Sequence, residues 1–478
     1  MKIPSALKNM TGYALGLFFI KGISLIMLPI MARYLLPEQL GKLELLASIG
    51  MFFGLLMGLA MHEALYRFAG EQTNSVQRKA IASELFRNGL MISGNISAGL
   101  LFAANTLPVT QWIPASQIEI NVLLLSLSLE SAIGLGLAWL RMQDQVKAFL
   151  KICIGTSVFQ VTLVLLVLQF MPSVAGILFA SFIAHLAQLI AIQVYSRLDL
   201  STKNTIPFRT YLTYCIPMML SGLVAFGLNG AERWILAAST SLAELGQYAI
   251  AAKFSLAMCI LVQPFGMWWM PKRFDYLNNK GANATLRVTQ YGLVLISCLT
   301  LFMAGIGQVF ILIALPDLYH DASKLLVATL AVAWCKEITE LTNIGILFHK
   351  KTQWLLYTNI AATLFGLTVA FALTSYGIWG ILFALFSAQF VRMLAVTYLS
   401  QMLSVLPYQF SKLSTLFVVT FGLLYLFAQD LSVTVISLMA LSAPILILLL
   451  ATKLALLPIA QSTIWHDVSQ RFTRRTQQ

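Results

Sequence analysis

Long apolar stretches separated by short polar breaks run through almost the entire sequence. A hydrocarbon core of roughly 30 Å is crossed by about 20 apolar residues in a helix. Because no water satisfies backbone groups inside lipid, stretches of this length form helices, and the alternating pattern of barrel strands is absent. The pattern predicts fourteen transmembrane helices, at residues 11–35, 41–65, 82–107, 117–141, 147–170, 173–196, 209–238, 246–271, 287–315, 322–348, 354–375, 377–400, 410–428 and 431–452.

The composition agrees with an all-α integral membrane protein. Of 478 residues, 59% are hydrophobic and only 10% are charged, which lies outside the usual range for a water-facing surface. The formal net charge of +13 therefore concerns membrane topology rather than nucleic acid, which we do not expect as a partner. The five cysteines lie in apolar runs without C-x-x-C spacing, so neither a disulfide framework nor a zinc site is predicted.

Lysine and arginine gather at alternate ends of the predicted helices. With the N-terminus in the cytoplasm, 24 of the 31 Lys and Arg residues fall at cytoplasmic helix ends, Arg273 and Arg392 among them, as the positive-inside rule requires. Opposite loops, such as residues 108–117 and 239–245, contain no cation. Both termini are therefore predicted to be cytoplasmic. Seven cations lie elsewhere: Lys21, Arg33, Lys42, Arg233, Lys253, Lys324 and Lys336.

Two turns, after the first and the seventh helix, are similar. They read LLPEQLGKLELLASI from Leu35 and TSLAELGQYAIAAKF from Thr240, and each holds a Leu-Gly pair at the start of the outgoing helix. Two related halves of six helices are a common transporter plan, with the substrate site between the repeats near the membrane midplane. We expect six-helix bundles at residues 1–200 and 201–402, and two further helices with an amphipathic cytoplasmic tail at 403–478.

At these turns the chain resembles the polysaccharide transporter family, the Wzx-type O-antigen and oligosaccharide flippases of the multidrug/oligosaccharidyl-lipid/polysaccharide flippase superfamily. The resemblance lies in the opening KNMTGYALGLFFIKGISLIMLPIMARYLLPEQLGKLELL and in GAERWILAASTSLAELGQYAIAAKFSLAMCILVQPFGMWWMPKRF. In layout it covers essentially the whole chain, but the motifs are confined to these two regions. One departure is Glu232, which stands where the family commonly has Asp.

The resemblance implies a MATE-like pair of six-helix bundles around a central cavity, with two extra C-terminal helices. It also implies a flippase in the bacterial inner membrane, active in surface polysaccharide biosynthesis such as that of the lipopolysaccharide O-antigen. The substrate would be an undecaprenyl-diphosphate-linked oligosaccharide, moved from the cytoplasmic to the periplasmic leaflet. Membrane lipid, a glycan polymerase and a chain-length regulator are the further partners it suggests.

Charged residues inside predicted helices are candidate site residues, because each costs about 2.5 to 3.5 kcal/mol to insert unless it is paired, hydrated or functional. Lys21, Arg33, Arg233 and Lys253 could line a cavity as a cationic surface suited to pyrophosphate, with Asn229 and Trp268 meeting sugars. The alternative is ordinary ion pairing, of Glu232 with Lys253 and of Arg33 with Glu44.

Three acidic residues are candidates for coupling to H⁺ or Na⁺: Glu130, Glu337 and Glu340. A carboxyl group in an apolar environment takes up a proton more readily than in water, although Lys336 could simply neutralise one of them. The five histidines are scattered, and no catalytic triad, H-E-x-x-H motif or P-loop is present. We therefore predict a secondary transporter without catalytic residues, cofactor or metal site, rather than an enzyme.

Two other functions remain open at this stage. A multidrug/cation antiporter of the same fold would need an acidic cavity, whereas the first predicted helix carries Lys21 and Arg33 and no acid. A membrane glycan polymerase would show a long outer loop with arginine motifs, whereas the longest outer loop here has about ten residues and no cation. The sign of the charges favours an anionic substrate.

Overall fold

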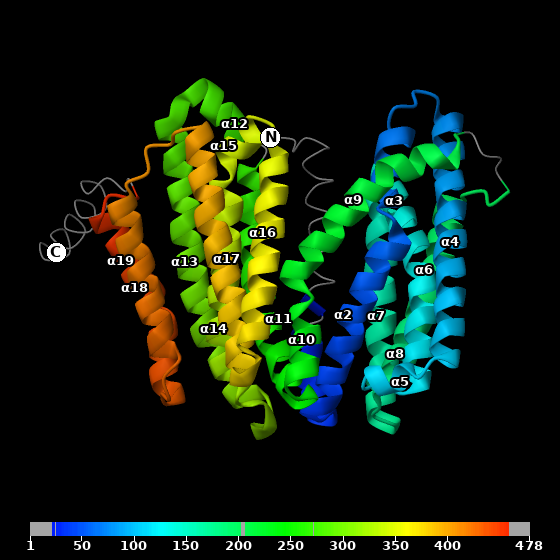
Figure 1. Cartoon of the computed structure of the whole chain (residues 1–478), viewed down its shortest axis with the longest axis horizontal. Helices are drawn as coiled ribbons and strands as arrows, with labels where there is room; N and C mark the ends of the chain where they lie inside the picture. The colour runs from blue at the N-terminus through cyan, green and yellow to red at the C-terminus, as the bar shows by residue number, and fades with distance from the viewer. Residues whose placement is uncertain (1–21, 24, 202–205, 271, 458–478) are drawn as a thin grey trace, which may run out of the picture. The chain divides into compact units, whose positions relative to one another are not determined.

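The computed structural model describes residues 22–23, 25–201, 206–270 and 272–457, and in this part of the chain the regular structure is entirely helical (Figure 1). The chain divides into two compact units, Met1–Ala249 with Val369–Ile381, and Ile250–Thr368 with Leu382–Gln478. The predicted boundaries at residues 200 and 402 stay predictions. Lys21 and the predicted amphipathic tail from residue 458 lie outside the described residues.

The first unit contains a helix at Leu25–Tyr34 and most of the N-terminal half of the chain. Its further helices are α2 (Pro37–Gly58), α3 (Met61–Ala64), α4 (Ser75–Thr106), α5 (Val109–Trp112), α6 (Gln117–Met142), α7 (Val146–Phe170), α8 (Val174–Ser196), α9 (Phe208–Asn229) and α10 (Glu232–Ser239). Several begin at a side chain that accepts a backbone N–H hydrogen bond, at Asn74, Ser116 and Ser173, which satisfies a donor that the helix itself leaves free.

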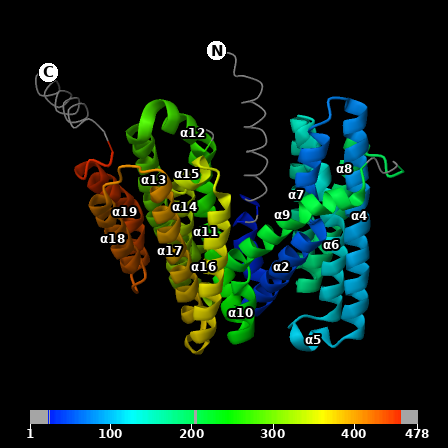
Figure 2. The ribbon, with the colours of Figure 1, turned by 45° about the horizontal axis from the view of Figure 1, so that its top comes forward.

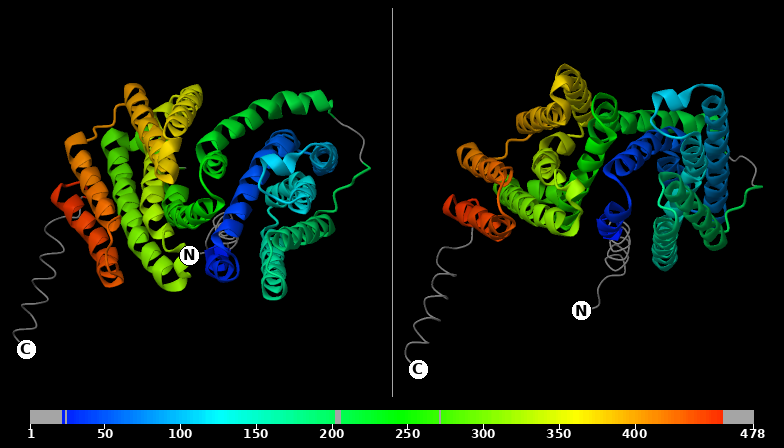
Figure 3. Two further views of the ribbon diagram at one scale, coloured as in Figure 1. Left: turned by 60° about the horizontal axis from the view of Figure 1, so that its bottom comes forward. Right: turned by 90° about the horizontal axis from the view of Figure 1, so that it is seen from below.

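The helix α11 (Leu242–Trp269) begins in the first unit and continues into the second. The helices that follow are α12 (Arg273–Asp275), α13 (Gly281–Ala314), α14 (Ala322–Thr342), α15 (Ile344–Phe348), α16 (Thr352–Ala372), α17 (Gly377–Leu403), α18 (Phe410–Phe427) and α19 (Val433–Lys453). In the second unit α13 packs against α14, α18 and α19, and Figure 3 shows α18 and α19 side by side.

Every predicted transmembrane segment that lies in the described residues corresponds to a helix. Eleven helical stretches of this part of the chain are long and apolar enough to cross a membrane. The other three predicted segments correspond to Leu25–Tyr34, α4 and α14. The prediction of an all-α, multi-pass membrane protein is confirmed.

Two predicted segments are interrupted rather than continuous. The segment predicted at 209–238 divides into α9 and α10 at Gly230 and Ala231. The segment predicted at 41–65 breaks after α2, where Leu59 and Ala60 both have positive φ angles, of 45° and 48°. Hydropathy does not register such breaks, because the residues that form them are themselves apolar or neutral. Polar side chains follow each break: His62 and Glu63 in α3, and Glu232 and Arg233 in α10.

The interior of the first unit is organised around α6, which packs against α2, α4 and α8. Trp139 of α6 and Tyr211 of α9 are buried in the same apolar cluster. Figure 1 shows α9 running obliquely past α2 and α3, which it contacts. This arrangement surrounds the C-terminal half of α2 with helices of the same unit.

The two similar turns of the sequence meet each other in the first unit. A Cβ atom added to Gly41 would lie 1.8 Å from the carbonyl oxygen of Leu242, and one added to Gly246 would lie 2.1 Å from that of Pro37. Only glycine allows backbones to approach this closely. The contact is reciprocal, so the Leu-Gly pairs of the two repeats form one pseudo-symmetric crossing between α2 and α11.

Candidate functional site

A buried ion network lies just beyond this crossing, with Arg233 at its centre. The guanidinium donates from Nε to Glu44 Oε1 of α2 at 2.7 Å and from Nη1 to Glu232 Oε1 at 2.7 Å. The hydroxyl of Tyr248 in α11 donates to the same Glu232 oxygen at 3.1 Å. Three helices are therefore joined through Arg233 and Glu232, and Figure 2 shows α10 beside α2.

The network is deeply placed and carries more negative than positive charge. Glu232 is only 5% exposed, and the side chains of Arg233 and Glu44 are 15% and 18% exposed. Two carboxylates surround one guanidinium, and Glu232 Oε2 is buried without a hydrogen-bond partner in the described residues. A buried carboxylate is costly without a cation beside it, so Arg233 is what allows both acids to be here.

Aromatic side chains close one side of the network. Trp234 donates from Nε1 to Ser48 Oγ at 2.9 Å. Its ring lies 5.1 Å from that of Phe52 and 5.3 Å from that of Phe226, measured between centroids. The three rings come from α10, α2 and α9, and they exclude water from the adjacent ion pairs, which strengthens the electrostatic attraction.

The ion pairs differ from those that the sequence suggested. Glu44 pairs with Arg233 rather than with Arg33, because α2 packs against α10 while Arg33 is on an exposed face of its own helix. Glu232 pairs with Arg233, its neighbour in sequence, where Lys253 was the suggested partner. The Leu-Gly repeat could have indicated these partners, if the two turns had been interpreted as segments that contact each other and not only as similar sequences.

The other predicted substrate contacts are dispersed among several elements. Lys253 lies half-buried in the part of α11 that belongs to the second unit. Trp268, in the same helix, is exposed and has the Lys272 ammonium 4.9 Å from its ring centroid. Asn229 is the last residue of α9. Of the predicted contacts, Arg233 is the one that the structure places in the buried network; convergence of the others on one cavity stays a prediction.

A second feature of the first unit is an acidic cavity of 380 Å³ at the break between α2 and α3. Glu130 lines it together with His62 and Glu63, and no Lys or Arg is among its lining residues. His62 Nε2 lies 3.6 Å from Glu63 Oε1. The sequence identified Glu130 but gave no role to His62 or Glu63, because the helix break beside these two residues leaves no mark in hydropathy.

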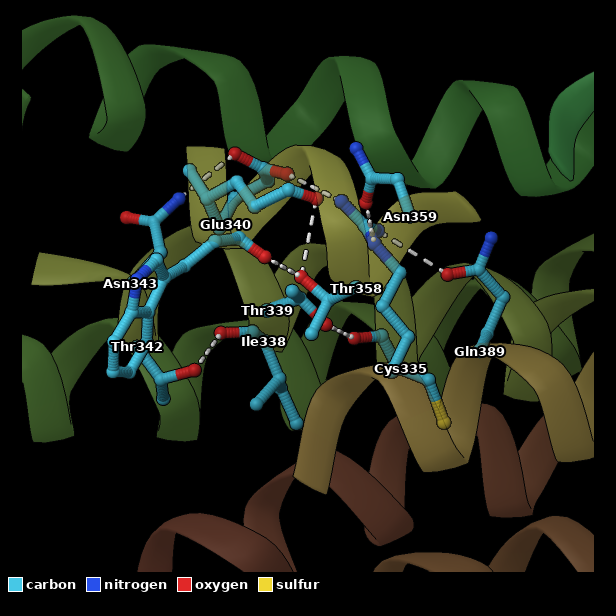
Figure 4. A network of polar contacts seen from close by, with 12 residues as sticks. Cys335, Ile338, Thr339, Glu340, Thr342, Asn343, Thr358, Asn359 and Gln389 are labelled. Carbon is cyan, nitrogen blue, oxygen red and sulfur yellow. Dashed lines mark hydrogen bonds and ion pairs between the residues drawn. The ribbon is translucent and has the colours of Figure 1, made fainter. Parts of the chain in front are cut away.

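The remaining acidic candidates lie in the second unit, on α14. Glu337 is half-buried, and Glu340 belongs to the polar network drawn in Figure 4. Arg392 Nη2 lies 3.5 Å from Glu340 Oε1, and Asn343 Nδ2 donates to Glu340 Oε2 at 3.3 Å. Arg392 was predicted at the cytoplasmic end of a helix, but it lies well inside α17, where it is bonded to neighbouring polar side chains. A buried polar partner can hold an arginine inside an apolar helix; the assignment of Arg392 to the cytoplasmic side stays a prediction.

Solved structures with the same fold are flippases and drug transporters. A lipid II flippase MurJ in an inward closed conformation matches with a TM-score of 0.68 and 15% identity, over 95% of this chain and 99% of that chain. A multidrug resistance MATE family transporter of the MOP superfamily, in an inward-facing conformation, matches with a TM-score of 0.60 and 13% identity, over 85% of this chain and 99% of that one. The fold thus defines a multi-pass membrane protein of the MurJ and MATE architecture.

Within this class the family is also clear. The chain belongs to the family described as "Polysaccharide biosynthesis protein", whose model matches residues 6–274. No curated protein matches the chain. The matched range includes both repeat turns and the network around Arg233, and it confirms the family resemblance predicted from those turns.

Proposed function

We propose that this protein is a flippase that moves an undecaprenyl-diphosphate-linked oligosaccharide from the cytoplasmic to the periplasmic leaflet of the bacterial inner membrane. The observation that carries the proposal is the combination of family membership with a fold that matches a lipid II flippase over nearly its whole length. A flippase of this kind binds an anionic diphosphate and a polar glycan within the membrane. Buried arginines and amides are suited to both groups.

In this proposal Arg233 is the centre of the anion site in the first unit, with Lys21 and Arg33 as further cations and Asn229 as a glycan contact. Lys253 and Trp268, in the second unit, stay predicted substrate contacts. Support comes from the two carboxylates that hold Arg233 in place, 2.7 Å away on either side. A carboxylate and a phosphate oxygen make similar charge-assisted bonds to guanidinium. Diphosphate binding is therefore proposed as an exchange, in which Glu44 or Glu232 releases Arg233 to the substrate.

Ion coupling is assigned in this proposal to the acidic cavity of the first unit. Glu130, with His62 and Glu63 at the same cavity, can take up and release H⁺ or bind Na⁺ as access to the two sides alternates. Glu337 and Glu340 were the other sequence candidates and stay candidates. Both termini are proposed to be cytoplasmic, and a glycan polymerase and chain-length regulator are proposed as later partners in the same biosynthesis.

Multidrug or cation antiport is the second candidate function, and the same acidic cavity is the observation that favours it. A cavity lined by Glu63 and Glu130 and by no Lys or Arg suits an organic cation. The MATE transporters share the fold. Against it stands the family, which is one of polysaccharide biosynthesis.

Deletion of the gene in its native host separates the two functions. A flippase defect leaves lipid-linked oligosaccharide in the cytoplasmic leaflet and removes surface glycan, and both are restored by the wild-type protein. An antiporter defect leaves surface glycan normal and raises sensitivity to cationic drugs. Normal glycan in the deletion strain, without a second flippase gene, would overturn the proposal.

A further inference from the structure

Two arginines in the second unit are held by neutral amides rather than by matching acids. Arg392 donates from Nε to Asn359 Oδ1 at 2.7 Å and from Nη1 to Gln389 Oε1 at 3.3 Å. These amides come from α16 and α17 and fix the plane of the guanidinium without neutralising its charge. Asn359 and Gln389 are labelled in Figure 4.

Arg273, at the start of α12, is held in a similar way. It is only 7% exposed and donates from Nη1 to Asn343 Oδ1 at 3.0 Å. Its Nε is buried and has no hydrogen-bond partner among the described residues. A buried guanidinium donor without an acceptor is costly, so this position is suited to an additional oxygen ligand.

One loosely bound carboxylate, that of Glu340, contacts Arg392 directly and reaches Arg273 through Asn343, which bonds to both. Its distances to Arg392 Nη2 and Asn343 Nδ2 are 3.5 Å and 3.3 Å, whereas charge-assisted bonds are usually about 2.7–2.9 Å. The Glu340 side chain is 43% exposed. The charged groups joined by these contacts are two guanidinium groups and one carboxylate, which is an excess of positive charge.

Arg392 lies well inside α17, whereas Glu340 and Asn343 lie at the C-terminal end of α14 and Arg273 at the start of α12. Arg392 is eleven residues before Leu403, the last residue of α17, which is roughly 16 Å at 1.5 Å per residue. A half-exposed carboxylate faces water or a polar ligand, because lipid does not solvate it. The site is therefore accessible and polar, although it lies inside a helical bundle.

We propose that Arg273 and Arg392 form an oxyanion site for a phosphate group, and that Glu340 is an internal carboxylate which the incoming phosphate displaces. The two guanidinium groups, fixed by Asn343, Asn359 and Gln389, supply donors from both sides. The choice of phosphate rests on the proposed flippase function, whereas the anion site itself rests on these contacts alone. The phosphate belongs either to the diphosphate of a lipid-linked substrate or to the headgroup of an anionic phospholipid.

The site is tested with purified full-length protein in phosphatidylcholine nanodiscs, titrated with inorganic pyrophosphate against sodium chloride of equal ionic strength. We expect pyrophosphate to raise the thermal unfolding midpoint of the wild type. Glu340→Gln removes the competing carboxylate and should bind pyrophosphate about tenfold more tightly, and Arg392→Gln should bind it about tenfold more weakly. Arg287→Gln, which removes an exposed arginine of α13, is the matched control and should behave as the wild type.

A second set of nanodiscs with phosphatidylglycerol identifies the source of the phosphate. A rise in the unfolding midpoint supports the site if Arg392→Gln abolishes that rise. If pyrophosphate produces the rise, the site binds a diphosphate; if only phosphatidylglycerol produces it, the site binds a phospholipid headgroup. No rise with either probe overturns the proposal.

Glu340→Gln keeps the test valid if Arg392→Gln fails to fold. A purely structural ion pair predicts that Glu340→Gln is less stable and gains no affinity for either probe, and that result also overturns the proposal. Pyrophosphate binding that persists in a protein without glycan transport counts against the flippase function and leaves the anion site standing.

Discussion

Arg233 neutralises two carboxylates at once, so its removal should affect stability before it affects any ligand. Arg233→Ala leaves Glu44 and Glu232 facing each other in a buried position, and losing one partner of a buried ion pair costs about 3–5 kcal/mol. We expect a large fall in the thermal unfolding midpoint and in protein level. Arg233→Lys keeps the positive charge, although it loses the planar group that reaches both acids. Its unfolding midpoint should therefore fall less than that of Arg233→Ala.

Arg33 provides the comparison for that measurement. Its side chain is exposed, and Arg33→Ala should leave the unfolding midpoint unchanged while it weakens glycan transport if Arg33 meets the diphosphate. Equal stability of Arg233→Ala and Arg33→Ala would show that the bonds of Arg233 to Glu44 and Glu232 contribute little.

Glu130 should act on transport and not on stability. It is exposed to the acidic cavity, so Glu130→Gln removes a proton or cation ligand with little change in packing. We expect glycan transport by Glu130→Gln to lose its response to an imposed proton or sodium gradient, while the unfolding midpoint stays that of the wild type. Glu38→Gln, at an exposed helix start, serves as control; a variant of Glu130 that still responds to both gradients contradicts this role.

Individual charged residues could be found in the sequence, but their partners could not. Arg233 and Glu130 were identified because a charge in an apolar segment is costly. The bond between Glu44 and Arg233 joins residues 189 positions apart, and it depends on a backbone contact that no local pattern records. Arg273 and Arg392 were taken for topological cations for the same reason, because Asn343 and Asn359, which bind them, come from other parts of the chain.

At the scale of helices, hydropathy predicted the positions of the membrane segments well, because each one must satisfy its own backbone in lipid. It missed the breaks at Leu59–Ala60 and at Gly230–Ala231, since these residues are apolar or neutral. Both breaks border a candidate site. The functional geometry therefore depends on the least predictable part of the helical pattern.

The glycine crossing of α2 and α11 should tolerate no side chain. Gly246→Ala places a methyl carbon 2.1 Å from the carbonyl oxygen of Pro37, which is far inside van der Waals contact. Overpacking of this kind costs about 1–3 kcal/mol or more. We expect a lower unfolding midpoint and a disturbed network around Arg233. Gly99→Ala in α4, where a Cβ atom has nothing within 4 Å, should be neutral or slightly stabilising. Equal behaviour of the two variants would refute a close crossing.

For the whole molecule, the charge distribution predicts which side each loop faces. A reporter enzyme fused after Lys351, between α15 and α16, should be located in the cytoplasm. The same reporter fused after Gln429, between α18 and α19, should be located in the periplasm. The opposite pattern at either position would contradict cytoplasmic termini and an even number of crossings.

The central claim, translocation of a lipid-linked oligosaccharide, is tested most directly in proteoliposomes that contain the purified protein. A fluorescent polyprenyl-diphosphate oligosaccharide is placed in both leaflets, and a membrane-impermeant reagent measures the fraction that becomes accessible from outside. The proposed function predicts that the protected inner fraction is lost with time in wild-type vesicles and stays protected in vesicles without protein. A protected fraction that does not change, together with export of an organic cation by the same vesicles, would contradict the flippase and favour antiport.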